Sequence, residues 1–341
     1  MDIPTQSTRV LLNARPTGRP THADFQVETV DLPPLATGQV RVVNEFCSVD
    51  PYMRGRMNDV KSYVPPFALG EPLVGAAVGR VVASEADDVA VGDVVLHGDG
   101  WRDVAQLDAA AVRVVEEVPG VPTSAFLGIL GMTGLTAWVG LTQIARFREG
   151  DAVLVSGAAG AVGSAAGQIA RLKGASRVVG SAGTPEKVAA LVERYGFDAG
   201  IDYRAAPIRS QLPDAAPDGI DVYFDNVGGD HLEAALDVMT TGGRVALCGA
   251  ISAYNATEPQ PGPDNMTNVV TRSLTLTGFT LAAYQHHMPE FLAEVGPWVR
   301  SGELVFDETV VDAVGDVGRT VDAFLGLLDG ENTGKMVVRT A

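Results

Sequence analysis

The stretch VLVSGAAGAVGSAAGQIARLKG, Val153–Gly174, decides the fold class of this 341-residue chain. A short apolar strand, Asp151–Ser156, leads into it, and a helix that runs through Lys173 follows. Between the two lies a run of glycine and alanine that is too rich in small residues for an ordinary loop. This arrangement predicts a strand and a helix in close contact, joined by a tight turn.

Three glycines give the junction its chemistry. Gly157, Gly160 and Gly163 stand where one glycine permits a tight turn, another lets the backbone approach a pyrophosphate, and a third allows close packing of helix on strand. The N–H groups at the helix start, near Ala161 and Val162, would then hold the phosphates together with the helix dipole. The spacing is G-x-x-G-x-x-G rather than the usual G-x-G-x-x-G, so the triplet alone is a weak signal. Its place between a buried strand and a helix predicts dinucleotide binding.

Strands and helices go on alternating beyond this junction. The predicted strands are Arg177–Gly180, Asp221–Phe224, Arg244–Cys248 and Leu274–Phe279, and the predicted helices are Pro185–Tyr195, with Thr184 as its N-cap, and His231–Met239. Strands that are apolar throughout indicate a parallel sheet covered on both faces.

The flanking segments have another pattern. Short Val-rich strands separated by Gly, Pro and Asp precede the junction, at Gln39–Phe46, Val78–Ser84 and Ala90–His97, and a helical segment, Pro122–Arg146, comes next. After it, a strand, a helix and a strand are predicted at Val305–Val311, Asp316–Leu328 and Lys335–Arg339. We therefore expect an α/β protein with a Rossmann-type, doubly wound parallel sheet at 123–304. That domain would be inserted into a discontinuous β-rich catalytic domain formed by 1–122 and 305–341.

The composition excludes several function classes. Asp and Glu number 42 against 25 Lys and Arg, a net charge of −17, and no basic cluster is present that would bind nucleic acid or anionic lipid. The apolar segments Ser124–Ala145 and Ala152–Leu172 are too rich in Gly, Ala, Ser and Thr for membrane spans. The N-terminus has no secretory signal, and the two cysteines form no CxxC motif, which fits a cytoplasmic protein without a disulfide framework.

The end of the second strand selects the dinucleotide. An NAD enzyme places Asp or Glu about 20 residues beyond the first glycines, where the carboxylate accepts hydrogen bonds from the ribose. This chain has Ser181, Ala182, Gly183 and Thr184 there, so no carboxylate would repel a 2′-phosphate. Lys187, one turn into the next helix, can reach that phosphate, and Tyr203 and Arg204 can complete the pocket. The sequence therefore favours NADPH.

Five stretches, taken together, resemble a known family over the whole chain. They are VDPYMRGRM (Val49–Met57), GAAGAVGSAAGQIARLKG, YFDNVGG (Tyr223–Gly229), GGRVALCGAISAYN (Gly242–Asn255) and GENTGKMVV (Gly330–Val338). The chain resembles the medium-chain dehydrogenase/reductase superfamily, and within it the zinc-independent prostaglandin reductase and 2-alkenal (double-bond) reductase group. The resemblance implies a chaperonin-10-like catalytic domain beside a Rossmann domain. It also implies a homodimer joined through Ser273–Leu281.

The resemblance also implies site residues. By position, Lys187 and Tyr203 are expected to contact the 2′-phosphate, and Asn226 and Asn332 other parts of the cofactor. Tyr254 is expected to bind substrate and handle the proton, with Tyr63 as a second tyrosine of the same pocket. Cys248 and Gly249, which end the strand before Tyr254, complete the expected cofactor-binding set.

No metal site is predicted. Cys47 matches the first ligand of the zinc enzymes in that superfamily, but the second motif reads Leu69-Gly70-Glu71 without a histidine, and the four-cysteine lobe is missing. One thiol does not make a tetrahedral site, so we interpret Cys47 as a packed core residue. His22, His97 and His231 are isolated in the sequence and suggest no cluster.

The expected reaction follows from these features. We expect NADPH-dependent reduction of the carbon–carbon double bond of an α,β-unsaturated aldehyde or ketone, with the enolate oxygen stabilised by the Tyr254 hydroxyl. A quinone reductase and an alcohol dehydrogenase or carbonyl reductase of the same superfamily are alternatives. An NADPH-binding protein without turnover is the alternative from another class.

Overall fold

The computed structural model describes residues 3–341, which divide into two compact units. Unit 1 comprises the chain up to Leu127 together with Glu308–Asn332 and Met336–Ala341. Unit 2 comprises Gly128–Asp307 and Thr333–Lys335. One continuous stretch thus builds most of unit 2, whereas unit 1 is assembled from segments on both sides of it.

Unit 2 is built on a six-stranded sheet with the order β10-β9-β8-β11-β12-β13, and its paired neighbours are parallel. The strands are β8 (Ala152–Val155), β9 (Arg177–Ala182), β10 (Ala199–Asp202), β11 (Ile220–Asp225), β12 (Met239–Leu247) and β13 (Thr275–Gly278). The predicted doubly wound parallel sheet is confirmed. The chain builds outward from β8 to β10, then returns to β11 beside β8 and builds outward again. The switch point therefore lies between β8 and β11, and ligands of such sheets bind at the carboxyl ends of these strands.

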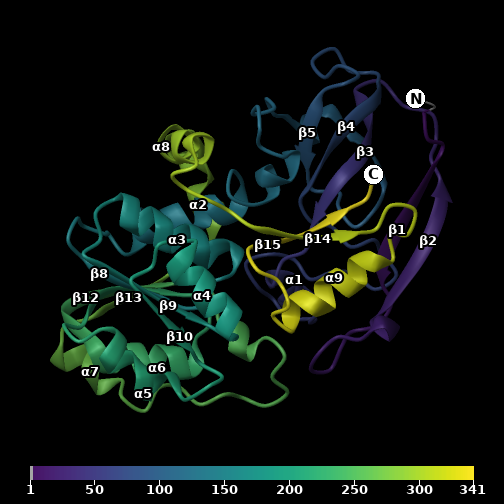
Figure 1. The fold of residues 1–341 in the computed structure, drawn as a ribbon. Helices are drawn as coiled ribbons and strands as arrows, with labels where there is room; N and C mark the ends of the chain where they lie inside the picture. The colour runs from purple at the N-terminus through teal and green to yellow at the C-terminus, as the bar shows by residue number, and fades with distance from the viewer. Residues whose placement is uncertain (1–2) are drawn as a thin grey trace. The chain divides into compact units, whose positions relative to one another are not determined.

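Helices cover both faces of this sheet. The helices of unit 2 are α2 (Met132–Val139), α3 (Ala161–Leu172), α4 (Pro185–Glu193), α5 (Ile208–Ala215), α6 (Gly229–Val238), α7 (Thr267–Thr271) and α8 (Met288–Ser301). The shorter turns are η4 (Gly140–Ile144), η5 (Ile251–Ala253) and η6 (Leu281–His287). Figure 1 shows α2 and α3 on one face of the sheet and α5 and α6 on the other. Leu154, Val179 and Tyr223 belong to the buried cluster on the α5–α6 face.

The helical segment predicted at Pro122–Arg146 is broken into three pieces. A short turn, η3 (Thr123–Leu127), is followed by α2 and then by the π-helical turn η4. Gly134 in α2 explains part of the break, because a Cβ there would lie 1.9 Å from the carbonyl oxygen of Ile129. The backbone folds tightly on itself at this point, and the pattern of apolar residues gave no sign of it.

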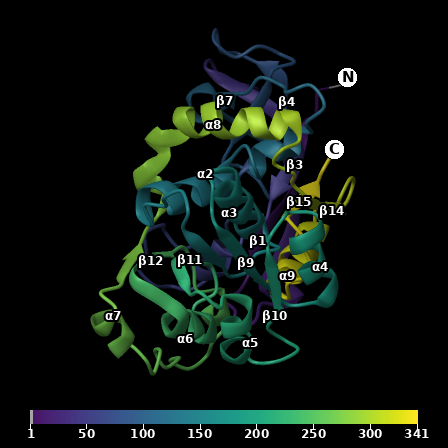
Figure 2. The same ribbon diagram turned by 60° about the vertical axis from the view of Figure 1, so that its left-hand side comes forward.

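Unit 1 is rich in antiparallel strands, as predicted. One sheet has the order β14-β15-β3-β4-β5-β7 with β6 paired to β3, and β1 and β2 form a separate pair. The strands are β1 (Gln6–Leu12), β2 (Phe25–Asp31), β3 (Gln39–Ser48), β4 (Ala77–Ser84), β5 (Val94–His97), β6 (Val104–Asp108), β7 (Arg113–Val114), β14 (Glu308–Asp312) and β15 (Lys335–Arg339). The helical pieces are η1 (His22–Asp24), α1 (Tyr52–Arg56), η2 (Ala109–Ala111) and α9 (Arg319–Leu328). Phe25, Trp101 and Phe324 pack ring against ring in its core, and α9 lies beside β14 (Figure 2).

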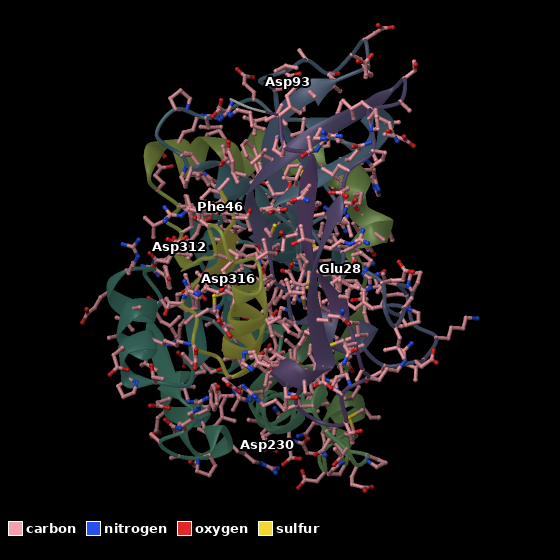
Figure 3. The ribbon with its side chains drawn as sticks, turned by 90° about the vertical axis from the view of Figure 1, so that its right-hand side faces the viewer. Glu28, Phe46, Asp93, Asp230, Asp312 and Asp316 are labelled. Atoms are coloured by element: carbon pink, nitrogen blue, oxygen red, sulfur yellow. The ribbon has the colours of Figure 1, made fainter. Side chains whose placement is uncertain are left out.

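The starts of four predicted elements differ from the structure by three residues or more. The helix predicted from Asp316 begins at Arg319, the strand predicted from Val305 begins at Glu308, the strand predicted from Arg244 begins at Met239, and the strand predicted from Ala90 begins at Val94. Several acidic side chains lie on the surface. Asp230, Asp312 and Asp316, labelled in Figure 3, are exposed. In the part of the chain that the structure describes, no helix is long and apolar enough to cross a membrane.

Candidate cofactor site

The glycine-rich loop between β8 and α3 has the geometry of a phosphate cradle, with a different demand at each glycine. Gly157 has φ +59°, a conformation that a side chain disfavours. A Cβ on Gly163 would lie 2.4 Å from the Gly157 carbonyl oxygen and 2.7 Å from the Ala158 Cα. A Cβ on Gly160 would meet only the Gly157 oxygen, at 3.3 Å, so the space beside Gly160 is open. The three expected features are therefore present: a tight turn at Gly157, open space beside Gly160 and close backbone packing at Gly163.

The start of α3 fits an anion. Gly160 is its N-cap and has no side chain to bond the first N–H groups of the helix, which include those of Ala161 and Val162. Such groups carry the positive end of the helix dipole and bind phosphates in dinucleotide folds. The cradle is also tied to the end of the chain, because the Gly334 N–H donates to the Ala159 carbonyl at 2.8 Å. Asn332 is buried and directly precedes this tied segment.

Two cations, Lys187 of α4 and Arg204 after β10, lie near the end of β9. Thr184 caps α4, as predicted, by accepting from the Lys187 N–H at 3.3 Å. Burial lowers the pKa of Lys187, and the positive charge of Arg204 lowers it further. Two like charges so close together make a site that an anion would stabilise. Asp202, two residues before Arg204, accepts from the N–H groups of Arg204 and Ala205.

Tyr203 belongs to the same site. A Cβ on Gly183 would lie 2.6 Å from the Tyr203 hydroxyl and 3.2 Å from Arg204 Nε, so Tyr203 and Arg204 converge over Gly183. Ser181 lies in the strand just before, fully buried. Its carbonyl accepts from the Ala158 N–H at 2.9 Å, which joins the end of β9 to the glycine loop. The expected residues Ser181, Gly183, Lys187 and Tyr203 thus lie together.

Asn226 stands at the carboxyl end of β11 and is bonded to the end of β8. Its side-chain amide donates to the Ser156 carbonyl at 2.7 Å, and its N–H donates to the Ser156 hydroxyl oxygen at 2.9 Å. Beneath it, Asp225 is fully buried. One oxygen of Asp225 accepts from the Ser156 and Tyr223 hydroxyls, at 3.1 and 2.7 Å, and from the N–H groups that follow it in the chain. This network fixes the turn that presents Asn226 at the switch point.

Tyr254 follows η5, at the carboxyl end of β12. Its hydroxyl lies 3.2 Å from the position of a Cβ on Gly249, and the Ala250 N–H points to it at 3.5 Å. A Cβ on Gly249 would also lie 3.1 Å from the Asn226 carbonyl oxygen. The structure therefore brings Tyr254, Gly249 and Asn226 together. Cys248 precedes them, and burial together with the nearby Asp225 raises the pKa of its thiol to about 12. Cys248 is a neutral thiol at the carboxyl end of β12.

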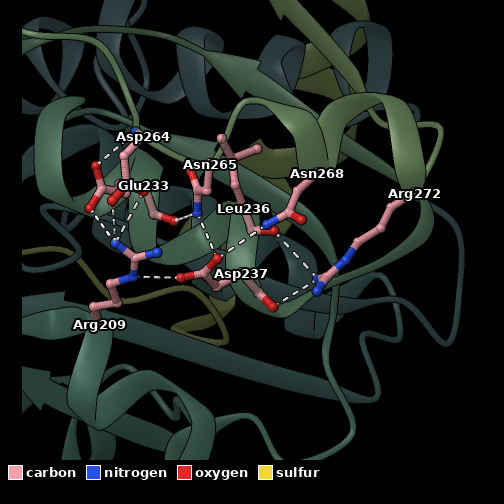
Figure 4. A network of polar contacts seen from close by, with 8 residues as sticks. All are labelled: Arg209, Glu233, Leu236, Asp237, Asp264, Asn265, Asn268 and Arg272. Carbon is pink, nitrogen blue, oxygen red and sulfur yellow. Dashed lines mark hydrogen bonds and ion pairs between the residues drawn. The ribbon is translucent and has the colours of Figure 1, made fainter.

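The segment after Tyr254 is held at its far end. Arg209 of α5 donates to Glu233 at 2.6 Å and to Asp264 at 3.2 Å, and it also bonds Asp237 (Figure 4). The Asn265 side-chain amide adds bonds to the Glu233 carbonyl at 2.8 Å and to Asp237 at 2.7 Å. This network anchors the last residues of the segment 255–265 to α5 and α6.

Unit 1 contains the other expected tyrosine and the expected packed thiol. Tyr63 is 66% exposed, and its electrostatic influence contributes to the raised pKa of Tyr52 in α1, whose main cause is burial. Cys47 is fully buried and donates to the Arg102 carbonyl at 3.6 Å, and burial raises the pKa of its thiol. A neutral thiol bonded to a carbonyl is poorly suited to a metal. Over residues 3–341, no group of three or more His, Cys, Asp or Glu is arranged to hold a metal ion.

Two kinds of functional residue escaped the sequence analysis. Asp225 and Ser156 were passed over, although the YFDNVGG stretch places a carboxylate at the end of an apolar strand, which is a signal for a buried hydrogen-bonding group. Arg209 gave no signal, because its partners are 24 to 55 residues away in the chain.

The fold and this cradle define a two-domain oxidoreductase with a Rossmann dinucleotide-binding domain. Two family models match: "N-terminal domain of oxidoreductase" over residues 8–115 and "Zinc-binding dehydrogenase" over residues 161–296. The chain is 43% identical to the putative NADP-dependent oxidoreductase YfmJ of Bacillus subtilis, over 98% of this chain and 97% of that protein. It is 40% identical to the NADPH-dependent curcumin reductase of Escherichia coli, with the same coverage.

A solved structure supports the same family relationship. The structure of CurA from Vibrio vulnificus in complex with NADPH superposes with a TM-score of 0.92 at 40% identity, covering 98% of this chain and 99% of that one. The chain therefore belongs to the medium-chain dehydrogenase/reductase superfamily, in the group of prostaglandin, 2-alkenal and curcumin reductases.

Proposed function

We propose that this protein is an NADPH-dependent reductase of the carbon–carbon double bond in α,β-unsaturated aldehydes and ketones. The observation that carries the proposal is the Tyr254 hydroxyl beside Gly249 and Asn226, at the carboxyl end of the strands where the nicotinamide of a dinucleotide would lie. The family membership supports the same reaction, since the relatives include an NADPH-dependent curcumin reductase and an NADP(+)-dependent 2-alkenal reductase.

The cofactor would be NADPH, held by this chain's own groups. The open face of Gly160 and the first N–H groups of α3 would hold the pyrophosphate. Lys187, Tyr203 and Arg204 would hold the 2′-phosphate, because that phosphate relieves the repulsion between the two cations. Asn226 would position the nicotinamide side, and Asn332 would add a contact from the segment tied to the glycine loop.

The chemistry divides between cofactor and protein. When bound, NADPH supplies the hydride that adds to the β-carbon of the substrate. Negative charge then develops on the carbonyl oxygen, and the Tyr254 hydroxyl stabilises it by donating a hydrogen bond while uncharged. A proton that the Tyr254 hydroxyl or a water molecule gives to the α-carbon completes the saturated product. Tyr63 is the second tyrosine that we assign to substrate binding.

β13 is the last strand of its sheet, so its outer edge can pair with the same strand of a second copy. We propose such a homodimer and a cytoplasmic location, where both cysteines stay reduced. Light scattering in solution checks the dimer, and a monomer at micromolar concentration would contradict it.

The test of the function is a substrate panel followed by NADPH absorbance. The panel holds a medium-chain 2-alkenal, benzylideneacetone, the matching saturated aldehyde and a small quinone, each also with NADH and with a chelator. We expect turnover of the alkenal and the enone with NADPH, little with NADH, and no effect of the chelator. Turnover of the quinone alone would replace the proposal with quinone reduction. Tight NADPH binding without any turnover would support a non-catalytic role.

A further inference from the structure

His231, in the first turn of α6, packs against the expected cofactor residue Tyr203. The two rings meet edge to face, with centroids 5.0 Å apart and an angle of 75° between their planes. His231 is only 6% exposed, so this contact lies inside unit 2 and not on its surface. Edge-to-face packing is a preferred geometry for aromatic rings and fixes their relative orientation. His231 therefore helps to set the orientation of the Tyr203 ring.

Tyr203 is held from a second side by Gly183. The hydroxyl and Cζ of Tyr203 lie 2.6 and 2.9 Å from the position that a Gly183 Cβ would take. The hydroxyl end of the ring therefore rests on bare backbone at the end of β9. Arg204 Nε lies 3.2 Å from the same position, and the charge of Arg204 acts on Lys187. The contact with Gly183 and the contact with His231 together place the Tyr203 hydroxyl beside the two cations.

His231 is a polar side chain that is buried beside Tyr203, and the contact it makes there is made by its ring. Among the described residues, its Nε2 is buried without a hydrogen-bond partner in the protein, and so is Oδ2 of the nearby Asp225. Burial also lowers the pKa of His231, so the ring is neutral at neutral pH. A neutral aromatic ring orients Tyr203 without adding a third positive charge to the site.

We propose that His231 is a positioning residue for cofactor specificity, which holds the Tyr203 ring over Gly183 so that its hydroxyl, with Lys187 and Arg204, meets the 2′-phosphate of NADPH. The proposal rests on the proposed use of NADPH and extends it to a residue outside the phosphate pocket. His231 acts through Tyr203 and has no contact of its own with the phosphate.

The test uses ligands that isolate this end of the cofactor. Binding of adenosine 2′,5′-bisphosphate and of 5′-AMP is measured by calorimetry for the wild type, His231→Leu, Tyr203→Leu and the double variant. We expect His231→Leu to weaken the bisphosphate about three- to tenfold, the range set by the worth of a buried aromatic pair, and to leave 5′-AMP within about twofold. The double variant should bind no more weakly than Tyr203→Leu, because the two residues act as one unit.

Two further variants separate positioning from damage to the fold. His231→Phe keeps an aromatic ring against Tyr203 and should restore most of the affinity for the bisphosphate. His286→Leu, at an exposed histidine of the same unit, is the matched control and should bind both ligands normally. Wild-type affinity in His231→Leu, an equal loss for both ligands, or additive losses in the double variant would each overturn the inference. A wild type that binds neither the bisphosphate nor NADPH would overturn the proposed function instead.

Discussion

Alanine at Gly163 and alanine at Gly160 should damage different properties of the protein. Gly160 is the N-cap of α3 and Gly163 lies in its first turn, and a Cβ on either would approach the Gly157 carbonyl oxygen. A Cβ on Gly163 would lie 2.4 Å from that oxygen and 2.7 Å from the Ala158 Cα, and both obstacles are backbone atoms. A Cβ on Gly160 would lie 3.3 Å from the oxygen and within 4 Å of nothing else outside its chain neighbours.

The magnitudes follow from these distances. Gly163→Ala must push α3 away from the loop by several tenths of an ångström, and overpacking of this kind costs about 1–3 kcal/mol. Gly160→Ala needs only a small shift, and at an N-cap the loss of glycine costs a further few tenths to ~1 kcal/mol. Its methyl group would, however, occupy the open space through which the pyrophosphate approaches, so NADPH affinity should fall at least tenfold.

Two measurements separate the effect on stability from the effect on cofactor binding, one on the protein without cofactor and one with NADPH. Urea unfolding of the apoprotein should show a clearly lower midpoint for Gly163→Ala and a smaller decrease for Gly160→Ala. Fluorescence titration with NADPH should show the larger loss of affinity in Gly160→Ala. If Gly160→Ala binds NADPH as the wild type does, the pyrophosphate does not approach that face. If Gly163→Ala unfolds at the wild-type midpoint, the close packing that we derive from the backbone distances is wrong.

Three other perturbations test separate parts of the molecule. Tyr254→Phe should lower kcat by about tenfold or more with NADPH affinity unchanged, since one hydrogen-bond donor to the developing charge is removed; an unchanged kcat in steady-state assays would remove Tyr254 from the reaction. Burial lowers the pKa of His97 to about 4 from 6.5. Between these two pH values the unfolded chain binds a proton that the folded protein does not, so about 3 kcal/mol of stability is lost as the pH falls from 6.5 toward 4. Urea midpoints at pH 7 and pH 5 should therefore differ more for the wild type than for His97→Gln, and equal differences would refute this. Arg209→Met should leave the carboxylates of Glu233, Asp237 and Asp264 close together without a cation, so amide exchange in residues 255–265 should become faster while NADPH binding stays the same. Arg171→Met, at another exposed ion pair, is the control. Unchanged slow exchange in Arg209→Met would show that the network does not hold the segment.

Local signals in the sequence were sufficient for the nucleotide-binding unit. Gly157, Gly160 and Gly163 were assigned three roles, and the structure has a positive φ, an open face and a close backbone contact at these positions. Thr184 was expected to cap α4 and does. These features depend on residues that are neighbours in the chain, so a strand, a turn and a helix start can be read from a short stretch.

Features that depend on distant partners could not be predicted. The break in Pro122–Arg146 arises because Gly134 lies against the Ile129 carbonyl, a contact that apolar spacing does not encode. His231 looked isolated because its aromatic partner, Tyr203, is 28 residues away in the sequence. Asp225 could have been suspected, but the four groups that donate to one of its oxygens come partly from another strand, through Ser156. Buried polar side chains therefore mark where sequence reasoning ends, because their partners are set by the fold.

The arrangement of charge at the end of β9 gives the strongest reason to expect discrimination between the two nicotinamide cofactors. Burial lowers the pKa of Lys187, and repulsion by the like charge of Arg204 lowers it further. A ligand with a 2′-phosphate converts that repulsion into two attractions, whereas NADH leaves the repulsion in place and offers the cations only a ribose hydroxyl. Specificity is a difference between two affinities, and here the wrong ligand is penalised by groups that the right ligand neutralises. Lys187→Gln removes both the repulsion and one attraction to the 2′-phosphate. It should therefore weaken NADPH binding and strengthen NADH binding, which brings the two affinities closer.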